Sequence, residues 1–246
     1  MKKIAVVIAI TLALCFAHAA DAQNLTLTSK MFSRYLGQNG GIFYDTPVVQ
    51  TDLWAGWSNG VYADIWWSCA ANGGGFHTTF ANEIDYNVGI VKPLGAYNVD
   101  VGILYIDVVP LGTVFNDVWS PYAEIGRSFT LGTVAVAPYL RLEGYHNVDG
   151  SKTNFQPGWT QWGYAGARWR WSITPAIELS ANARIFHDSG GLGKNEGWLG
   201  QAFVTTKAKI SARTAILTDI KFSTPIDVTD DRTTEFIVGA GLSYSF

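Results

Sequence analysis

Two side chains in the last third of the chain have the spacing of a nucleophile and its base. His187 and Ser189 are separated by one residue, so both point to the same face of an extended strand. A serine hydroxyl needs a base within hydrogen-bond reach, and a third group that orients the base, before it can attack an acyl carbon. Polar residues are also ordinary where a strand meets a loop such as Gly190-Gly191, so His187 and Ser189 need no catalytic role. We therefore expect no enzyme, and a hydrolase is the last of three alternatives.

Charged residues are the second set that could do chemistry, because the predicted strands between residues 47 and 107 carry mainly acidic residues and those between residues 133 and 224 mainly basic ones. If the chain closes into a barrel, an acidic arc of the inner wall faces a basic arc, and the resulting field filters small polar solutes. The alternative is a lattice of ion pairs that fills a narrow lumen. The residues predicted to line the lumen are Asp52, Asp64, Glu83, Asp85, Asp100, Glu124, Arg141, Glu143, Arg168, Arg170, Glu178, Arg184, Arg213, Asp219 and Lys221.

The remaining reactive residues form no recognisable site. His77 and His146 are isolated, and no cluster has the spacing of metal ligands, so we expect neither a metal nor another cofactor. The 17 Lys and Arg residues are outnumbered by 20 Asp and Glu residues and form no basic block, which argues against a nucleic-acid partner. Cys69 is the only cysteine after residue 22, which excludes an intramolecular disulfide.

The first 22 residues predict a secretory signal peptide. Lys2 and Lys3 precede an apolar run from Ile4 to Phe16, and Ala20-Asp21-Ala22 has the pattern of a cleavage site. The apolar run is shorter than the roughly 20 residues that a spanning helix needs. We expect residues 1–22 to be removed and residues 23–246 to form the mature domain.

Residues 23–246 predict an all-β protein, because apolar and polar residues alternate with a period of two along most of their length. Charged residues make up 15% of the chain, against about 25% in soluble domains. No later apolar run could cross a bilayer as a helix, so membrane insertion must use strands. Strands are predicted at about residues 25–36, 47–57, 60–69, 80–93, 97–107, 117–128, 133–145, 157–171, 174–187, 197–209, 211–224 and 232–246.

The connections between these strands alternate in length. Tight turns such as Ser58-Asn59 and Leu94-Gly95-Ala96 alternate with long polar loops such as 146–156 and 188–196. This alternation is typical of outer-membrane barrels, whose short turns are periplasmic. An open sheet edge in lipid would leave backbone groups unpaired, so the sheet must close. We predict a single closed antiparallel transmembrane β-barrel, most simply of 12 strands, with both termini in the periplasm.

The side chains of the predicted strands indicate which face meets lipid. Ile177 and Ile185 alternate with Glu178 and Arg184, and the apolar set is assigned outward because a charge on the lipid face costs roughly 2–4 kcal/mol. Strand n faces strand n+6 in a ring of twelve, so Asp52 should face Arg168 and Arg170, and Asp64 should face Arg184. Tryptophans near predicted strand ends fit interfacial girdles; they are Trp54, Trp57, Trp67, Trp119, Trp159, Trp169, Trp171 and Trp198.

Three short segments resemble a known family. Residues 33–37 (Ser-Arg-Tyr-Leu-Gly), 60–68 (Gly-Val-Tyr-Ala-Asp-Ile-Trp-Trp-Ser) and 82–85 (Asn-Glu-Ile-Asp) are similar to the TorF-like putative porins. Leu36 is a departure, since that family more often has Arg directly before the glycine. The resemblance implies an outer-membrane channel of unassigned substrate. The final alternating segment, with Tyr244 and Phe246, resembles the terminal strand that the barrel-assembly machinery recognises.

These observations predict a passive channel in the cell outer membrane. Its expected partners are outer-membrane lipid, the barrel-assembly machinery and small polar solutes. The first alternative is a non-conducting barrel with a structural or adhesive role. The second is an outer-membrane hydrolase that uses His187 and Ser189, whose spacing resembles that of outer-membrane phospholipases and lipid A deacylases.

Overall fold

The computed structural model describes residues 24–72, 81–108, 111, 117–148, 159–190 and 194–246, so the predicted signal peptide lies outside the described residues. The described chain is built from β-strands, and no helix in it is long and apolar enough to span a membrane. The strands are β1 (Asn24–Phe32), β2 (Tyr35–Leu36), β3 (Ile42–Tyr44), β4 (Val48–Gly56), β5 (Val61–Ala70), β6 (Glu83–Leu94), β7 (Tyr97–Val108), β8 (Val118–Gly126), β9 (Phe129–Leu131), β10 (Val134–Asn147), β11 (Trp159–Ser172), β12 (Ile177–Ser189), β13 (Glu196–Lys209), β14 (Thr214–Val228) and β15 (Glu235–Ser245).

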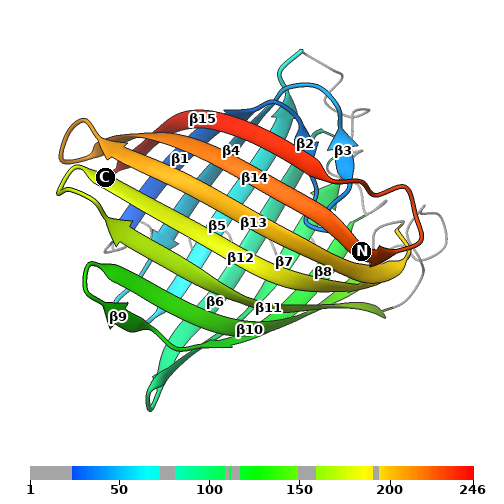
Figure 1. Cartoon of the computed structure of the whole chain (residues 1–246), viewed down its shortest axis with the longest axis horizontal. Coiled ribbons are helices and arrows are strands. Elements are labelled where there is room, and N and C mark those ends of the chain that lie inside the picture. Colours follow the sequence, from blue (N-terminus) through cyan, green and yellow to red (C-terminus); the bar gives the residue numbers. More distant parts are fainter. Residues whose placement is uncertain (1–23, 73–80, 109–110, 112–116, 149–158, 191–193) are drawn as a thin grey trace.

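The main sheet closes on itself, which confirms the predicted 12-stranded antiparallel barrel (Figure 1). β1 pairs with β4 on one side and with β15 on the other, and β10 pairs with both β8 and β11. The short strand β9 is additional, because it pairs with the first residues of β10 as part of one turn. β2 and β3 form a separate two-stranded sheet.

The predicted strand boundaries agree with the structure to within a few residues, with one instructive exception. The prediction extends the first strand to residue 36, but β1 ends at Phe32. Residues 33–47 leave the wall there and carry β2 and β3. We call residues 33–47 the inserted segment, because its side chains line the interior of the barrel together with those of the wall.

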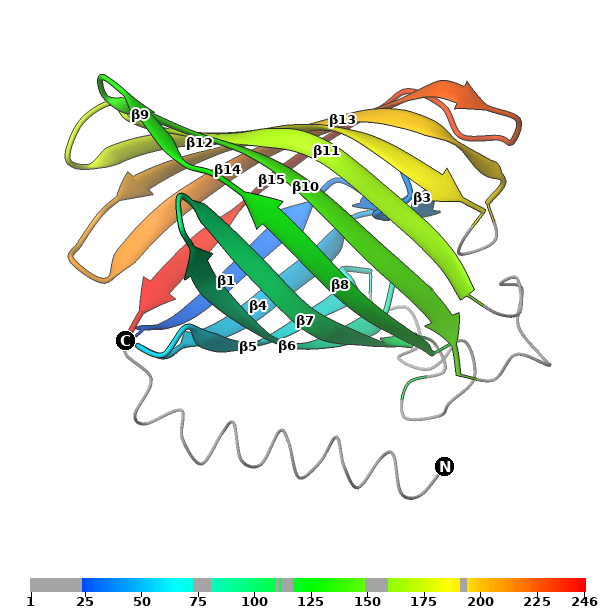
Figure 2. The same ribbon diagram turned by 90° about the horizontal axis from the view of Figure 1, so that it is seen from below.

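The two ends of the barrel differ as predicted. Short turns connect the strands at one end, the turn end, where Asn24 and Phe246 also lie, and longer connections occur at the other, the loop end (Figures 1 and 2). Gly60, Gly95 and Gly132 have positive φ values of 86°, 61° and 62° in these short turns. Glycine adopts this conformation without the steric cost that a side chain brings.

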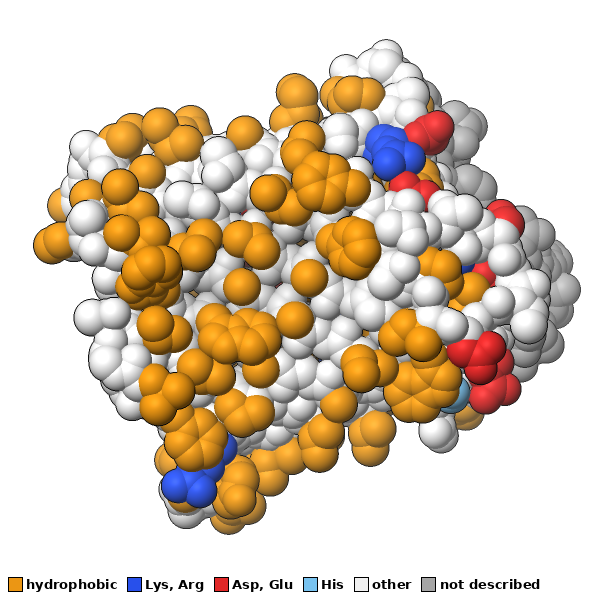
Figure 3. All heavy atoms as spheres, viewed as in Figure 1, with side chains coloured by type: hydrophobic (Ala, Val, Ile, Leu, Met, Phe, Trp, Pro, Cys, Tyr) orange, Lys and Arg blue, Asp and Glu red, His pale blue; other side chains and the backbone are white. Residues whose placement is uncertain are grey.

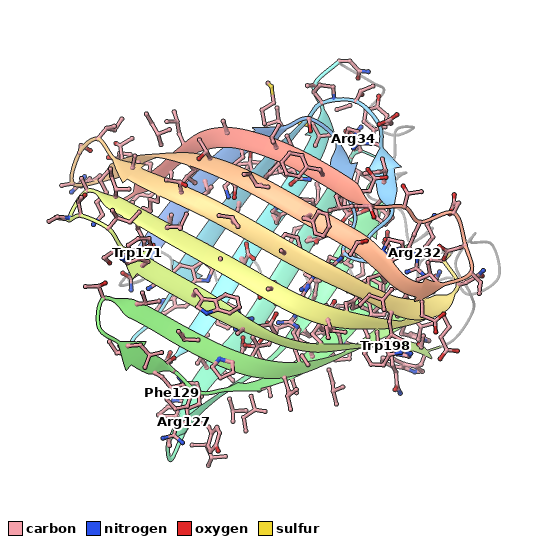
Figure 4. The ribbon with its side chains drawn as sticks, viewed as in Figure 1. Arg34, Arg127, Phe129, Trp171, Trp198 and Arg232 are labelled. Atoms are coloured by element: carbon pink, nitrogen blue, oxygen red, sulfur yellow. The ribbon has the colours of Figure 1, made fainter. Side chains whose placement is uncertain are left out.

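The outer face of the barrel is apolar. Large side chains such as Leu142 and Phe236 are 72% and 57% exposed, and in Figure 3 charged side chains of the visible face gather at its two ends. Figure 4 places Trp171 and Phe129 at the turn end and Trp198 at the loop end. The exposed apolar set includes the predicted outward residues Ile177 and Ile185, and also Val238 and Leu242. A soluble protein rarely exposes so continuous an apolar surface.

The inner face is less polar than the alternation of residues in the sequence predicts. The strand registers place Leu104, Ile106 and Phe186 on the same face as the charged lumen residues, and they pack in a buried cluster with Trp162 and Leu199. A second cluster includes Tyr35 and Leu36 of the inserted segment. At the loop end, apolar side chains therefore point inward and form buried clusters within the lumen, where the inserted segment also lies.

The turn glycines provide a test of the fold. At Gly60 an added Cβ would lie 2.2 Å from the carbonyl oxygen of Val91, whereas at Gly95 nothing lies within 4 Å. Gly95→Ala should cost only the left-handed backbone penalty of about 1–2 kcal/mol. Gly60→Ala should cost clearly more, because the backbone of β6 must also move. Urea unfolding in detergent micelles measures both, and equal losses would contradict the close approach of Val91 to Gly60.

Candidate functional site

The inserted segment crosses the lumen at the loop end. Its tip, Gln38 to Gly40, receives hydrogen bonds from three strands of the opposite wall: Gln201 Nε2 donates to the Gln38 carbonyl oxygen at 3.0 Å, and the hydroxyls of Tyr145 and Tyr164 donate to Gln38 Oε1 at 3.3 and 3.4 Å. A Cβ added at Gly40 would lie 2.4 Å from Leu199 Cδ2, and the Gly40 φ is +79°. Glycine thus permits close contact between the tip and β13.

Arg232 fixes this tip from the loop between β14 and β15. Its fully buried guanidinium pairs with Asp188 Oδ2 and with Asp230 Oδ2, each at 2.9 Å, and donates to the Asn39 carbonyl oxygen at 3.1 Å. Burial alone would raise the pKa of Asp230, but hydrogen bonds from Arg232 and from the backbone of Asn195 outweigh this effect and lower it. No pattern in the sequence pointed to Arg232, because a single arginine in a polar loop is ordinary.

Four carboxylates form a continuous patch on β4, β5 and β6, which we call the acidic wall: Asp52, Asp64, Glu83 and Asp85. Their registers place all four on the inner face. The Oδ1 atoms of Asp52, Asp64 and Asp85 are enclosed and have no hydrogen-bond partner within the described part of the chain. Neighbouring carboxylates repel one another when they are ionised, so a cation that approached this wall would relieve the repulsion.

The arginines on the other side of the lumen pair with acids on the same or a nearby strand. Arg168 binds Glu124 with two hydrogen bonds of 2.5 and 2.7 Å, and Arg141 lies 3.1 Å from Glu143. Arg170 lies 3.7 Å from Glu178. Arg168 and Arg170, which the sequence sets opposite Asp52, thus pair with acids closer to them. Short side-chain reach favours a partner on the same strand or within two strands over one across the barrel.

Three arginines of the inner face also lie over tyrosine rings. The guanidinium carbons of Arg141, Arg168 and Arg184 are 3.8, 3.9 and 4.4 Å from the ring centroids of Tyr122, Tyr139 and Tyr164. Arg184 also donates to Gln201 at 2.7 Å. Such stacking fixes the guanidinium planes and keeps them against the wall.

The other predicted lumen residues have local partners. Asp100 accepts a hydrogen bond of 2.9 Å from Tyr62, Asp219 lies 3.0 Å from Lys30, and Lys221 donates to Gln50 at 3.3 Å. Arg213 is a correction: it lies in the turn before β14 and not on the inner face of a strand. The prediction placed the start of this strand three residues too early.

A cavity of about 580 Å³ lies between the inserted segment and the inner wall. The acidic wall lines one side of it, and Leu104, Ile106 and Val108 of β7 line another. Its volume is in the range of sites for small organic molecules. Sequence reasoning found the acidic residues but missed the cavity, because the cavity depends on where the inserted segment packs.

The proposed catalytic pair lies outside the lumen. His187 stands opposite Trp198 in the β12–β13 register, with ring centroids 4.6 Å apart, and its Nε2 lies 3.4 Å from Glu196 Oε1. Ser189 Oγ accepts the backbone N–H of Gln161 at 2.7 Å. The two side chains share a face, as predicted, but each is engaged by a different partner. Among the described residues, no group of three potential ligands could hold a metal ion.

A closed 12-stranded barrel with an apolar exterior and a charged interior is an architecture typical of outer-membrane β-barrels. No family model and no curated protein matches the sequence. The solved structures that are similar include a NanC porin, with a TM-score of 0.59 and 11% identity over 90% of this chain and 100% of that one. An outer membrane channel from Pseudomonas putida F1 has a TM-score of 0.55 and 9% identity over 92% and 96% of the two chains. At these identities the similarity shows the fold alone.

Loss of the Arg232 contacts should destabilise the loop end selectively. Arg232→Met leaves Asp188 buried without its cation, and breaking such a pair typically costs about 3–5 kcal/mol. Arg34→Met is the matched control, because Arg34 makes partly exposed pairs with Asp45 and Glu235, which are worth about 0–1 kcal/mol. We expect faster amide hydrogen exchange at residues 37–41 in Arg232→Met alone. Unchanged exchange in that variant would show that Arg232 does not hold the tip.

Proposed function

We propose that the protein is an outer-membrane channel that passes small polar solutes through a lumen narrowed by the inserted segment. The observation that carries this proposal is a closed barrel whose exterior is apolar and whose interior holds both charged side chains and a cavity. The same proposal includes a cleaved signal peptide at residues 1–22 and a periplasmic location of the turn end with both termini.

The exterior supports insertion in a bilayer. The wall strands contain 9 to 15 residues, which suffices for tilted strands to cross the hydrocarbon core. At the turn end, the Arg127 guanidinium lies 4.8 Å from the Phe129 ring centroid, next to the apolar band (Figure 4). Aromatic and basic side chains are favourable at the boundary between acyl chains and headgroups.

The interior supports passage from the turn end toward the cavity. The side chains of Arg168 and Arg170 are 46% and 69% exposed, so water reaches this part of the lumen. At the loop end, the tip of the inserted segment and the apolar cluster with Phe186 restrict the path. We therefore propose a narrow channel of low conductance.

The charge balance of the lumen favours cations. Arg141 and Arg168 are neutralised by Glu143 and Glu124, whereas the acidic wall has no ion pair with a Lys or Arg among the described residues. We propose that the lumen residues predicted from the sequence, apart from Arg213, line the pore. Rings of uncompensated carboxylates select cations in channels.

Two finer assignments accompany this proposal. The resemblance of residues 33–37, 60–68 and 82–85 supports a relation to the TorF-like porins. Tyr244 and Phe246 point outward at the end of the last strand, with ring centroids 5.0 Å apart, and we propose that they are read by the barrel-assembly machinery.

A non-conducting structural barrel is the second candidate. The contacts of Gln38 with Tyr145, Tyr164 and Gln201 span the lumen at the loop end, and this observation favours the alternative. The two functions differ in whether the inserted segment ever leaves a continuous aqueous path.

Single-channel recording in planar bilayers tests the proposal. The wild-type barrel should give small, discrete, cation-selective conductance steps. Arg232→Met should increase the conductance or the open time because the tip is released, whereas Arg34→Met should leave both unchanged. A heat-modifiable, folded barrel that is silent in both the wild-type and the Arg232→Met form would contradict the channel and support the structural role.

Selectivity provides an independent measurement. Arg168→Gln removes the partner of Glu124 and should shift the reversal potential in a salt gradient further toward the cation value. Arg170→Gln, at the more exposed pair with Glu178, is the control and should produce a smaller shift because solvent screens it. A shift toward the anion value in Arg168→Gln would contradict the charge balance described here.

A further inference from the structure

The lumen cavity has two chemically different walls, and neither is explained by passive flow alone. One is the acidic wall of Asp52, Asp64, Glu83 and Asp85; the other consists of aromatic and aliphatic side chains from the inserted segment, β5 and β7. A water-filled passage for inorganic ions needs the first wall but gains nothing from the second.

The acidic wall has no cationic partner among the described residues. Three cations also line the cavity, but Arg141 is paired with Glu143 and Lys194 with Asp231, while Lys221 donates to the neutral Gln50 and lies 3.9 Å from the Phe32 ring centroid. Within the described chain no Lys or Arg forms an ion pair with these four carboxylates. An enclosed carboxylate without a partner is costly to ionise, so a cation that enters the cavity would be favoured because it stabilises the ionised form.

Aromatic rings adjoin these carboxylates. In the strand register Trp66 stands between Asp52 and Asp85. Its ring centroid is 5.9 Å from that of Tyr35, which is in turn 5.4 Å from that of Phe43. All three rings line the cavity. Aromatic faces attract ammonium groups and also bury apolar surface.

We propose that the cavity is a binding site for a small organic cation, namely a protonated amine carried on an apolar or aromatic body. The ammonium group would lie against the carboxylates of Asp64 and Asp85, and the body would pack between Trp66 and the aliphatic wall of Leu104 and Ile106. A bare metal ion fits less well, because the described residues contain no group of three metal ligands. The inference that such amines are solutes of the channel rests on the proposed function, but binding of an amine to the cavity requires no ion flow.

Calorimetry on the detergent-solubilised full-length barrel tests this site separately from conductance. The probe is 2-phenylethylammonium, and phenylacetate, which has a similar body with the opposite charge, is its control. We expect saturable binding of the amine only. Asp64→Asn/Asp85→Asn should weaken it by about tenfold or more, as expected for loss of about 1.4 kcal/mol of charge interaction. Glu178→Gln, at the turn end, should bind as the wild type does.

Stability distinguishes a binding role from a structural one. Because the replaced carboxylates repel each other, Asp64→Asn/Asp85→Asn should unfold at the same or a higher temperature than the wild type, although its affinity for the amine falls. Trp66→Leu keeps the carboxylates and removes an aromatic ring, so it should also weaken binding of the amine. If the double variant does not fold, this single variant tests the site in its place. The proposal is overturned by absent amine binding, by equal binding of phenylacetate, or by unchanged binding in a folded variant. Calorimetric binding by a barrel that is silent in bilayers would support the site and contradict the channel.

Discussion

Closure of the sheet between β1 and β15 is the constraint on which the other features depend. In this register Thr26 pairs with Ser245 and Phe32 with Gly239, so the first and last wall strands satisfy each other's backbone groups. An unpaired strand edge in hydrocarbon would cost several kcal/mol per exposed group. Closure also separates two environments: alternate side chains of each strand face either the surroundings or the lumen. The apolar exterior, the charged interior and the space for the inserted segment follow from this separation.

Most of the wall could be predicted from the sequence because the alternation of side chains has the same period as the strand. The segment after β1 could not, because Tyr35 and Leu36 continue an acceptable strand pattern beyond the point at which the chain turns inward. The clearest missed signal is the composition of residues 35–44, in which glycines separate bulky apolar side chains. Such a segment is too apolar for a solvated loop, and its glycines permit close packing against another wall.

The candidate site was only partly predictable, for a physical reason. Register and face follow from the period of two, so the sequence locates Asp52, Asp64 and Asp85 on one surface. Pairing depends on side-chain reach, and Arg168 meets Glu124 before it can reach across the barrel. The result is a lumen in which the basic side is internally compensated and the acidic side is not. The proposed cation selectivity and the proposed amine site both originate in that asymmetry.

The contacts of the inserted segment also have a mechanical consequence. Gln38 is hydrogen-bonded to strands on the opposite wall, and Arg232 links Asn39 to Asp188. The tip therefore connects two sides of the barrel wall inside the loop end. A barrel without internal struts can flatten into an ellipse at little energetic cost. Here the loop end should keep a nearly constant cross-section, while the turn end, which has no such contacts, deforms with lateral pressure in the surrounding lipid. Membrane tension would therefore change the diameter of the barrel at one end more than at the other.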